Sequence, residues 1–180
     1  MKFTYLALVA CAFCQVQAQN YQYEGINSEP SWKEHIGGGW EKGTLRFRTS
    51  VYTVHYNPKP EHNNHQKLIN VEYIRSDDWL VGLAVFRNSF GQPTQYVYLG
   101  KDWTLWQPTP DWRLRGTLTA GLLHGYKDEY KNKIPFNNLG IAPAILPMLG
   151  LQYKNIFLEA HFFATAGVMS TMGFTYDLDK

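Results

Sequence analysis

The stretch that decides the fold is residues 112–125, "WRLRGTLTAGLLHG", in which the character of the side chains alternates from one residue to the next. Leu118 and Leu122 fall on one side of this alternation, and Arg115 and Thr117 fall on the other. Successive side chains of a β-strand point to opposite faces of a sheet, so a period of two indicates a strand with one apolar and one polar face.

The same alternation recurs from Thr44 to the end of the chain. The segments with strand character are 44–57, 66–76, 78–88, 94–106, 112–126, 138–152, 155–164 and 168–177. Short turns at Asp77-Asp78 and Lys154-Asn155 alternate with longer loops at 57–65 and 127–137. Outer-membrane barrels have short periplasmic turns and longer extracellular loops. The sequence therefore predicts an all-β fold, an eight-stranded antiparallel up-and-down membrane β-barrel.

The alternation alone does not say which face lies inside. A soluble lipocalin-like barrel buries its apolar face, whereas a small membrane barrel turns that face to lipid and has a polar lumen. Aromatic residues make up 16% of the chain, which is high for a soluble domain. Four tryptophans lie near predicted strand ends, as the aromatic girdle of a membrane barrel requires: Trp79, Trp103, Trp106 and Trp112.

The polar face of the predicted strands carries charges of both signs. Its arginines are Arg46, Arg48, Arg113 and Arg115, and the acidic partners expected for them are Glu72, Asp102 and Glu159. Charged groups inside a barrel pair with one another, so we expect a structural role for this set.

Composition excludes several classes of protein. The chain of 180 residues has a formal net charge of +2 and no dense basic stretch, so no nucleic-acid partner is expected. It has no apolar run long enough for a transmembrane helix. Its cysteines, Cys11 and Cys14, lie in the apolar leader, which leaves the mature chain without disulfides or thiolate chemistry. No cofactor is expected.

The beginning of the chain predicts export. Lys2, the apolar run "FTYLALVACAFC" and the "VQA" ending at Ala18 together predict a secretory signal peptide over residues 1–18. "LVAC" also matches a lipoprotein box, but it lies very early in the chain. Residues 19–43 are predicted to be an N-terminal arm with a short interfacial amphipathic helix, and residues 44–180 to be the barrel. Trp32, Ile36 and Trp40 at i, i+4 and i+8 would form one face of that helix.

The sixth predicted strand departs from the alternation. "NLGIAPAILPMLGLQY", residues 138–153, is nearly all apolar and contains Pro143 and Pro147. Proline has no N–H to donate, so two prolines in one strand interrupt its pairing with a neighbour. In a closed barrel such an interruption would open a lateral gap in the wall, through which lipid could enter.

This proline-bearing strand, with "LAVFRNSFGQPTQYVYLGKDWTLW" and "TLTAGLL", resembles the family of the lipid A palmitoyltransferase PagP. That family has an N-terminal amphipathic helix and an eight-stranded outer-membrane barrel that holds an acyl chain in its lumen. The resemblance implies a lateral gate at Pro143 and Pro147 and an acyl-pocket floor at Gly100. It also implies transfer of an acyl group from phospholipid to lipid A by a monomer. Phospholipid and lipopolysaccharide in the outer membrane are therefore the expected partners.

The resemblance further implies a catalytic histidine late in the first strand and an aspartate-serine pair after the third. His55 and Ser89 match the histidine and the serine, while Asn88 stands where the family has aspartate. An asparagine is no carboxylate base, but it can orient a neighbour by hydrogen bonding. If both termini are periplasmic, the first and third strands both end at the extracellular rim, near His55 and Ser89. His55 shares a face with Phe47 and Val51, so it points inward only if a bulge or the strand end intervenes.

Other interpretations remain open from the sequence. His62 and His65 with Glu61 suit either a metal site or a solvated loop, and the loop setting favours the second. His55 and Ser89 suit either an acyl-transfer pair or a polar rim that binds lipid headgroups. The alternatives to an acyltransferase are a non-catalytic barrel, either structural or a small lipid or solute conduit, and a soluble periplasmic lipocalin-like binder.

Overall fold

The computed structural model describes residues 42–178. The predicted signal peptide and almost all of the predicted N-terminal arm, including its helix, lie outside these residues. The described strands are β1 Gly43–His55, β2 Ile69–Arg75, β3 Trp79–Arg87, β4 Pro93–Trp106, β5 Trp112–His124, β6 Ile141–Tyr153, β7 Ile156–Phe163 and β8 Gly167–Asp177. A 3₁₀-helix, η1, spans Asp128–Lys133.

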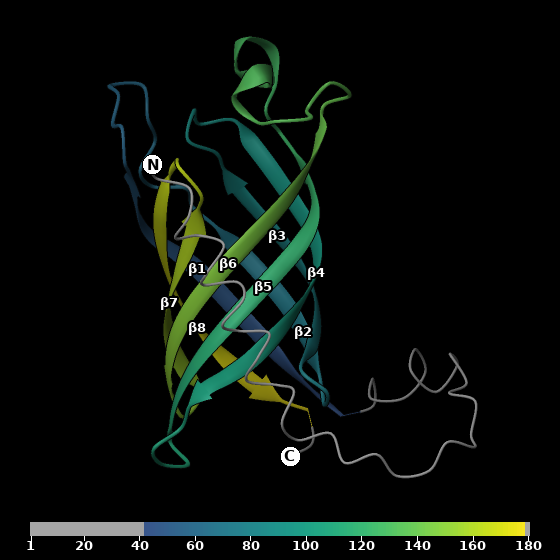
Figure 1. Cartoon of the computed structure of the whole chain (residues 1–180), viewed down its shortest axis with the longest axis vertical. Helices are drawn as coiled ribbons and strands as arrows, with labels where there is room; N and C mark the ends of the chain where they lie inside the picture. The colour runs from purple at the N-terminus through teal and green to yellow at the C-terminus, as the bar shows by residue number, and fades with distance from the viewer. Residues whose placement is uncertain (1–41, 179–180) are drawn as a thin grey trace, which may run out of the picture. The chain divides into compact units, whose positions relative to one another are not determined.

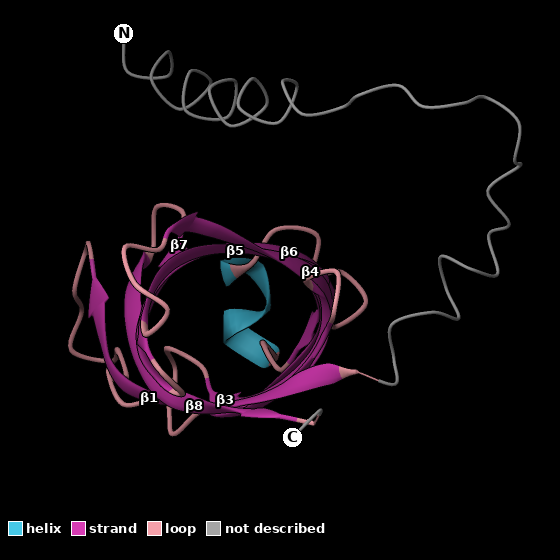
Figure 2. Ribbon diagram, turned by 90° about the horizontal axis from the view of Figure 1, so that it is seen from below, coloured by secondary structure: helices cyan, strands magenta, loops and turns pink. Residues whose placement is uncertain are grey.

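The strands form a closed barrel in sequence order (Figures 1 and 2). Each strand pairs antiparallel with the next, and β8 returns to pair with β1 from Thr44↔Asp177 to His55↔Gly167. The predicted eight-stranded antiparallel barrel is therefore confirmed. Closure removes the exposed strand edges, because every strand has a neighbour on both sides.

Two strands begin three residues later than the sequence predicts, and the backbone explains both differences. β2 begins at Ile69 rather than at residue 66, because Lys67 adopts a left-handed φ of 50° that ends extended pairing. β6 begins at Ile141, directly after Gly140 with a φ of +79°. The helix η1 lies in the predicted loop 127–137 and follows from local turn geometry rather than from any apolar period.

The apolar face of the sheet points outward. Leu99, Leu122 and Leu158 on β4, β5 and β7 are 61%, 58% and 62% exposed. Many inward positions are polar and buried, with Glu72 and Arg115 at 0%. An apolar outer face around buried polar residues is the pattern of an outer-membrane-type barrel, and the opposite of a soluble one.

The two ends of the barrel differ, and we call them the turn end and the loop end (Figure 1). The turn end has the connections 76–78, 107–111 and 154–155, and there the Leu178 N–H donates to the carbonyl of Gly43 at 2.9 Å. Three exposed tryptophans cluster at this end of β3, β4 and β5: Trp79, Trp106 and Trp112. The loop end has the connections 56–68, 88–92, 125–140 and 164–166, and η1 lies over the lumen there (Figure 2). In a membrane barrel the longer loops face outward.

Within the described residues, no helix is long and apolar enough to cross a membrane.

Backbone pairing is interrupted at two places in the loop half. The β6–β7 ladder runs from Tyr153↔Ile156 to Met148↔His161 and stops there, so residues 141–147 of β6 pair with β5 alone. The β1–β2 ladder stops at Thr49↔Ile69, beyond which β1 pairs only with β8. The wall is therefore fully paired in the turn half and incomplete in the loop half.

Candidate active site in the loop half of the lumen

His55, the last residue of β1, points into the barrel because β1 contains a bulge. The register with β8 shifts between Ser50 and Tyr52, which moves the inward positions from Arg48 to Thr53 and His55. His55 is only 9% exposed, whereas Val51 and Val54 lie outside. The β-bulge that an inward-pointing His55 requires is therefore present.

Ser89 follows the end of β3 and meets His55 across the rim. The His55 Nε2 lies 2.8 Å from the Ser89 Oγ, within hydrogen-bonding distance. β1 and β3 both run toward the loop end, which is why residues distant in sequence meet there.

The other ring nitrogen of His55 contacts a residue that the sequence reasoning missed. His55 Nδ1 lies 2.8 Å from the side-chain carbonyl of Asn64 in loop 56–68. The Asn64 amide donates to the Tyr52 hydroxyl at 3.1 Å, and the Asn64 backbone carbonyl accepts from the Thr53 N–H at 2.9 Å. No periodicity marks a loop asparagine, so only the folded loop reveals this contact.

Asn88 is buried beside Ser89, and its side chain holds the β3–β4 turn. Its carbonyl oxygen accepts from the backbone N–H of Phe90 at 2.9 Å and of Gln92 at 3.1 Å. Its side-chain amide donates to the carbonyl of Gly125 at 3.4 Å. Asn88 thus fixes the turn that carries Ser89, and the oxygen bonded to His55 Nδ1 belongs to Asn64.

His62 packs against the site, while His65 lies on the exposed outside of the same loop. The rings of His62 and His55 lie with centroids 4.2 Å apart and planes tilted by 34°, and the ring of Phe90 meets His62 edge-on at 5.6 Å. Burial and the neighbouring His55 lower the pKa of His62. Among residues 42–178, no group of three or more His, Cys, Asp or Glu side chains could hold a metal ion.

A cavity of about 380 Å³ extends from His55 and Ser89 into the loop half of the lumen. Most side chains along it are apolar or aromatic, including Leu68, Ala84, Phe86, Tyr96, Leu123, Leu146, Phe163 and Met169. Tyr126 lies at its upper end, where burial raises the pKa of the phenol and a hydrogen bond to Ser89 opposes that rise. The cavity is therefore an apolar slot with a polar group at its mouth, a shape that suits an acyl chain.

The deep end of the cavity is polar. Tyr98, Asn70, Arg48, Met148 and His161 line it there. Gly100, the floor that the resemblance implies, is not among the lining residues and is the next inward position of β4 beyond Tyr98. A Cβ on Gly100 would lie 2.7 Å from the carbonyl of Leu118 and 2.9 Å from Thr119, so side chains and backbone already fill that space.

The cavity also reaches the unpaired part of β6. Pro143 and Ile145, whose side chains are exposed on the outside of the barrel, contribute to its lining, together with the β7–β8 turn at 164–166. Pro147 lies immediately beyond the last β6–β7 pair, Met148↔His161. The residues implied as a lateral gate thus lie where the wall loses its backbone pairing.

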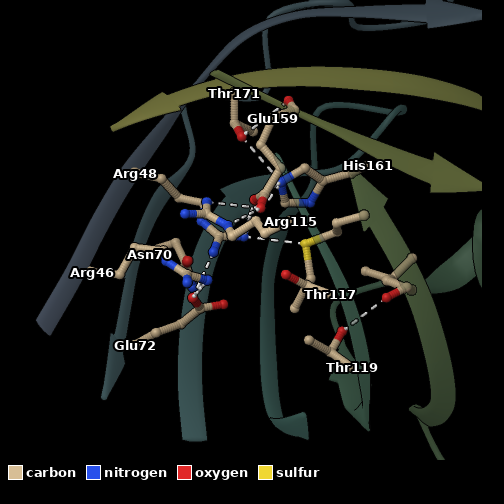
Figure 3. A network of polar contacts seen from close by, with 12 residues as sticks. Arg46, Arg48, Asn70, Glu72, Arg115, Thr117, Thr119, Glu159, His161 and Thr171 are labelled. Atoms are coloured by element: carbon tan, nitrogen blue, oxygen red, sulfur yellow. Dashed lines mark hydrogen bonds and ion pairs between the residues drawn. The ribbon is translucent and has the colours of Figure 1, made fainter. Parts of the chain in front are cut away.

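The turn half of the lumen contains a cluster of buried ion pairs, part of which Figure 3 shows. Arg48 bridges Glu72 at 2.5 Å and Glu159 at 2.8 Å, and Arg46 contacts Glu72 at 2.9 Å and also Asp102. Arg115 pairs with Glu159 at 3.0 Å, and its guanidinium lies 4.4 Å from the ring centroid of Phe157. We call these residues the lumen charge cluster: Arg46, Arg48, Arg115, Glu72, Asp102 and Glu159.

The lumen charge cluster supports the deep end of the cavity. The Tyr98 hydroxyl donates to Glu72 at 2.7 Å and accepts from the Asn70 amide at 2.7 Å. The predicted pairing of the lumen arginines is confirmed for Arg46, Arg48 and Arg115. It is wrong for Arg113, whose partly exposed guanidinium lies 3.8 Å from Asp78, because Arg113 is the second residue of β5 and lies at the turn end.

The comparisons with known proteins add little to this geometry. No family model matches the chain, and no curated protein matches it. Among solved structures, the chain is similar to the N-terminal β-barrel domain of Pseudomonas aeruginosa OprF, with 15% identity and a TM-score of 0.39 over 78% of this chain and 99% of that chain. A score this low carries no argument about function. The fold and the site themselves define the class, an eight-stranded outer-membrane-type barrel with a His-Ser pair above an apolar cavity.

Proposed function

We propose that this protein is a PagP-like outer-membrane acyltransferase that moves an acyl group from a phospholipid to lipid A. The observation that carries the proposal is the 2.8 Å contact between His55 Nε2 and Ser89 Oγ at the mouth of an apolar cavity. A serine alone is a weak nucleophile, and a histidine base within hydrogen-bonding reach is what activates it.

The chemistry follows from the pair. His55 Nε2 takes the proton of the Ser89 hydroxyl as Oγ attacks the ester carbonyl of the donor. The ester bond breaks, and the departing lysophospholipid oxygen takes that proton from His55. A hydroxyl group of lipid A then attacks the Ser89 ester with His55 again as the base, which regenerates Ser89 and leaves the acyl group on the acceptor.

The cavity and the incomplete wall support a lipid substrate. An acyl chain that enters between β6 and β7 would pass Pro143 and Ile145 and lie along the apolar side chains, with its ester near Ser89. The loop end of a membrane barrel faces the outer leaflet, which is where lipid A lies. The second interruption, between β1 and β2, lies on the strand that carries His55.

Two alternatives are less compatible with the geometry. A conduit needs an open lumen, whereas the lumen charge cluster occupies it with buried paired side chains. A soluble lipocalin-like binder needs a polar outer surface, whereas Ile69 and Ile145 are 68% exposed on the outside of the wall.

The test is mass spectrometry of lipid A from Gram-negative cells that express the wild-type protein, Ser89→Ala or Ser76→Ala. We expect an added acyl chain with the wild type and with Ser76→Ala, whose serine lies in the 76–78 turn, and none with Ser89→Ala. All three should appear in the outer-membrane fraction with heat-modifiable gel mobility. Unchanged lipid A in every strain, although the wild type is folded in the outer membrane, would overturn the transferase proposal.

A further inference from the structure

We infer that Asn64 is a positioning residue that fixes the tautomer and the orientation of His55. This inference rests on the proposed acyl transfer, because it assigns the third member of the same site. The sequence-based expectation gave this orienting role to Asn88, the residue beside the serine.

The tautomer follows from the atoms in contact. The Asn64 Oδ1 is a carbonyl oxygen that only accepts hydrogen bonds, so the His55 Nδ1 at 2.8 Å carries the proton. The neutral ring then has a free lone pair on Nε2, which lies 2.8 Å from the Ser89 hydroxyl. The contact therefore presents the basic nitrogen to the nucleophile, which is the task of the third residue in a Ser-His-acid triad.

The side chain and backbone of Asn64 both contact β1. Its amide nitrogen donates to the Tyr52 hydroxyl at 3.1 Å, and its amide oxygen faces His55. Its backbone carbonyl accepts from the Thr53 N–H, so the loop is tied to β1 two residues before His55. The His62 ring, whose centroid lies 4.2 Å from that of His55, restrains His55 from another side.

An amide in this position has a consequence that a carboxylate would not have. A carboxylate beside Nδ1 stabilises the charged imidazolium and raises the pKa of the histidine, whereas a neutral amide orients the ring with little effect on its charge. Replacement of Asn64 by aspartate should therefore keep the tautomer and move the acid limb of the pH profile to higher pH. The other titratable groups that face this site are His62 on the ring, Tyr126 at Ser89, Tyr52 at Asn64 and Lys133 in the cavity lining.

The experiment combines nitrogen NMR and kinetics on the full chain in detergent micelles. With ¹⁵N-labelled histidine, and His55→Gln to assign the signals, we expect a wild-type His55 protonated at Nδ1. Asn64→Ala should shift it toward the Nε2-protonated form, and Asn64→Asp should restore the Nδ1 proton. With dipalmitoyl phosphatidylcholine as donor and lipid A as acceptor, Asn64→Ala should lower kcat by about 100-fold, within the range that general-base catalysis contributes, and leave KM unchanged.

The matched control is Asn63→Ala, one residue earlier in the same loop. Asn63 donates to the backbone carbonyl of Asn88 at 3.2 Å and touches neither ring nitrogen of His55, so its loss tests whether any loop change has the same effect. Wild-type tautomer and kcat in Asn64→Ala would overturn the inference, as would equal losses in Asn63→Ala and Asn64→Ala. If the wild type transfers no acyl group, the proposed function fails, while the NMR signals still decide whether Asn64 sets the tautomer.

Discussion

The two halves of the lumen are built on the same eight strands but differ in their inward side chains and in the backbone pairing of the wall. In the turn half, the inward positions carry paired charges that fill the barrel, and each wall strand is hydrogen-bonded on both sides. In the loop half, most side chains along the cavity are apolar or aromatic, and the β6–β7 and β1–β2 ladders are interrupted. One closed sheet therefore separates a region of paired buried charges from a region with an apolar cavity, in which we propose that a lipid binds.

The buried charges of the turn half compensate one another. Glu72 contacts two arginines and a tyrosine hydroxyl while fully buried, so each of its oxygens is satisfied. Removal of one partner would leave the others buried without compensation, which is far less favourable than the intact cluster. The loop half has fewer such constraints, because apolar side chains around a cavity leave no charge unpaired.

The largest predicted effect is on the rate of acyl transfer at the site in the loop half. His55→Ala should reduce acyl transfer by about 1,000-fold, because it removes the base that activates Ser89. The free energy of unfolding should change little. Transfer rates in mixed micelles and urea unfolding in detergent measure the two quantities. His65→Ala is the control, since His65 is an exposed histidine of the adjacent loop; a similar loss there would contradict the assigned role.

A substitution in the lumen charge cluster of the turn half should instead lower the stability of the barrel. Glu72→Ala should lower the free energy of unfolding by about 3–5 kcal/mol, because Arg46 and Arg48 lose a buried partner. The control is Asp77→Ala, which breaks the exposed Arg75–Asp77 pair at 3.1 Å and should change stability by less than about 1 kcal/mol. Equal effects in urea unfolding would show that the buried cluster is not what stabilises the barrel.

The boundary between the halves sets the depth of the cavity. Tyr98→Ala should shift the preferred donor toward longer acyl chains, because the next inward position of β4 lies about 7 Å further along the strand. Gly100→Ala should leave the preference unchanged and reduce stability, since its Cβ would press on the carbonyl of Leu118. Transfer from phosphatidylcholines of graded chain length measures both. If only Gly100→Ala changed the preferred acyl-chain length, the floor of the cavity would lie at Gly100 instead.

The smallest expected effect concerns pH at the rim of the loop half. The pKa of His62 is lowered from 6.5, so the unfolded chain binds more protons than the folded protein between that lowered value and 6.5. The contribution of His62 to stability is therefore present above 6.5 and is lost as the pH falls through this window. NMR titration should find a His62 pKa below 6.5, and His62→Gln should flatten the stability profile there. A His62 pKa at or above 6.5 would contradict the packing of its ring against His55.

Much of the fold follows from the sequence because period-two alternation is a local signal. The eight strands and the pairing of three lumen arginines could be predicted in this way. The start of β2 could not, because the left-handed backbone of Lys67 leaves no pattern in the sequence. The site was predictable only in part: strand direction brings His55 and Ser89 to one rim, but a β-bulge decides that His55 points inward.

The sequence by itself determined the class of the fold, because alternating side chains and the positions of the turns are properties of short segments. Only the tertiary structure decided that the apolar face lies outside, since alternation is the same for either side of a sheet. It also decided that Asn64, rather than Asn88, meets His55, and that the cavity ends at Tyr98. Those contacts depend on how loops and strands distant in the chain come together, and no local pattern encodes such distances.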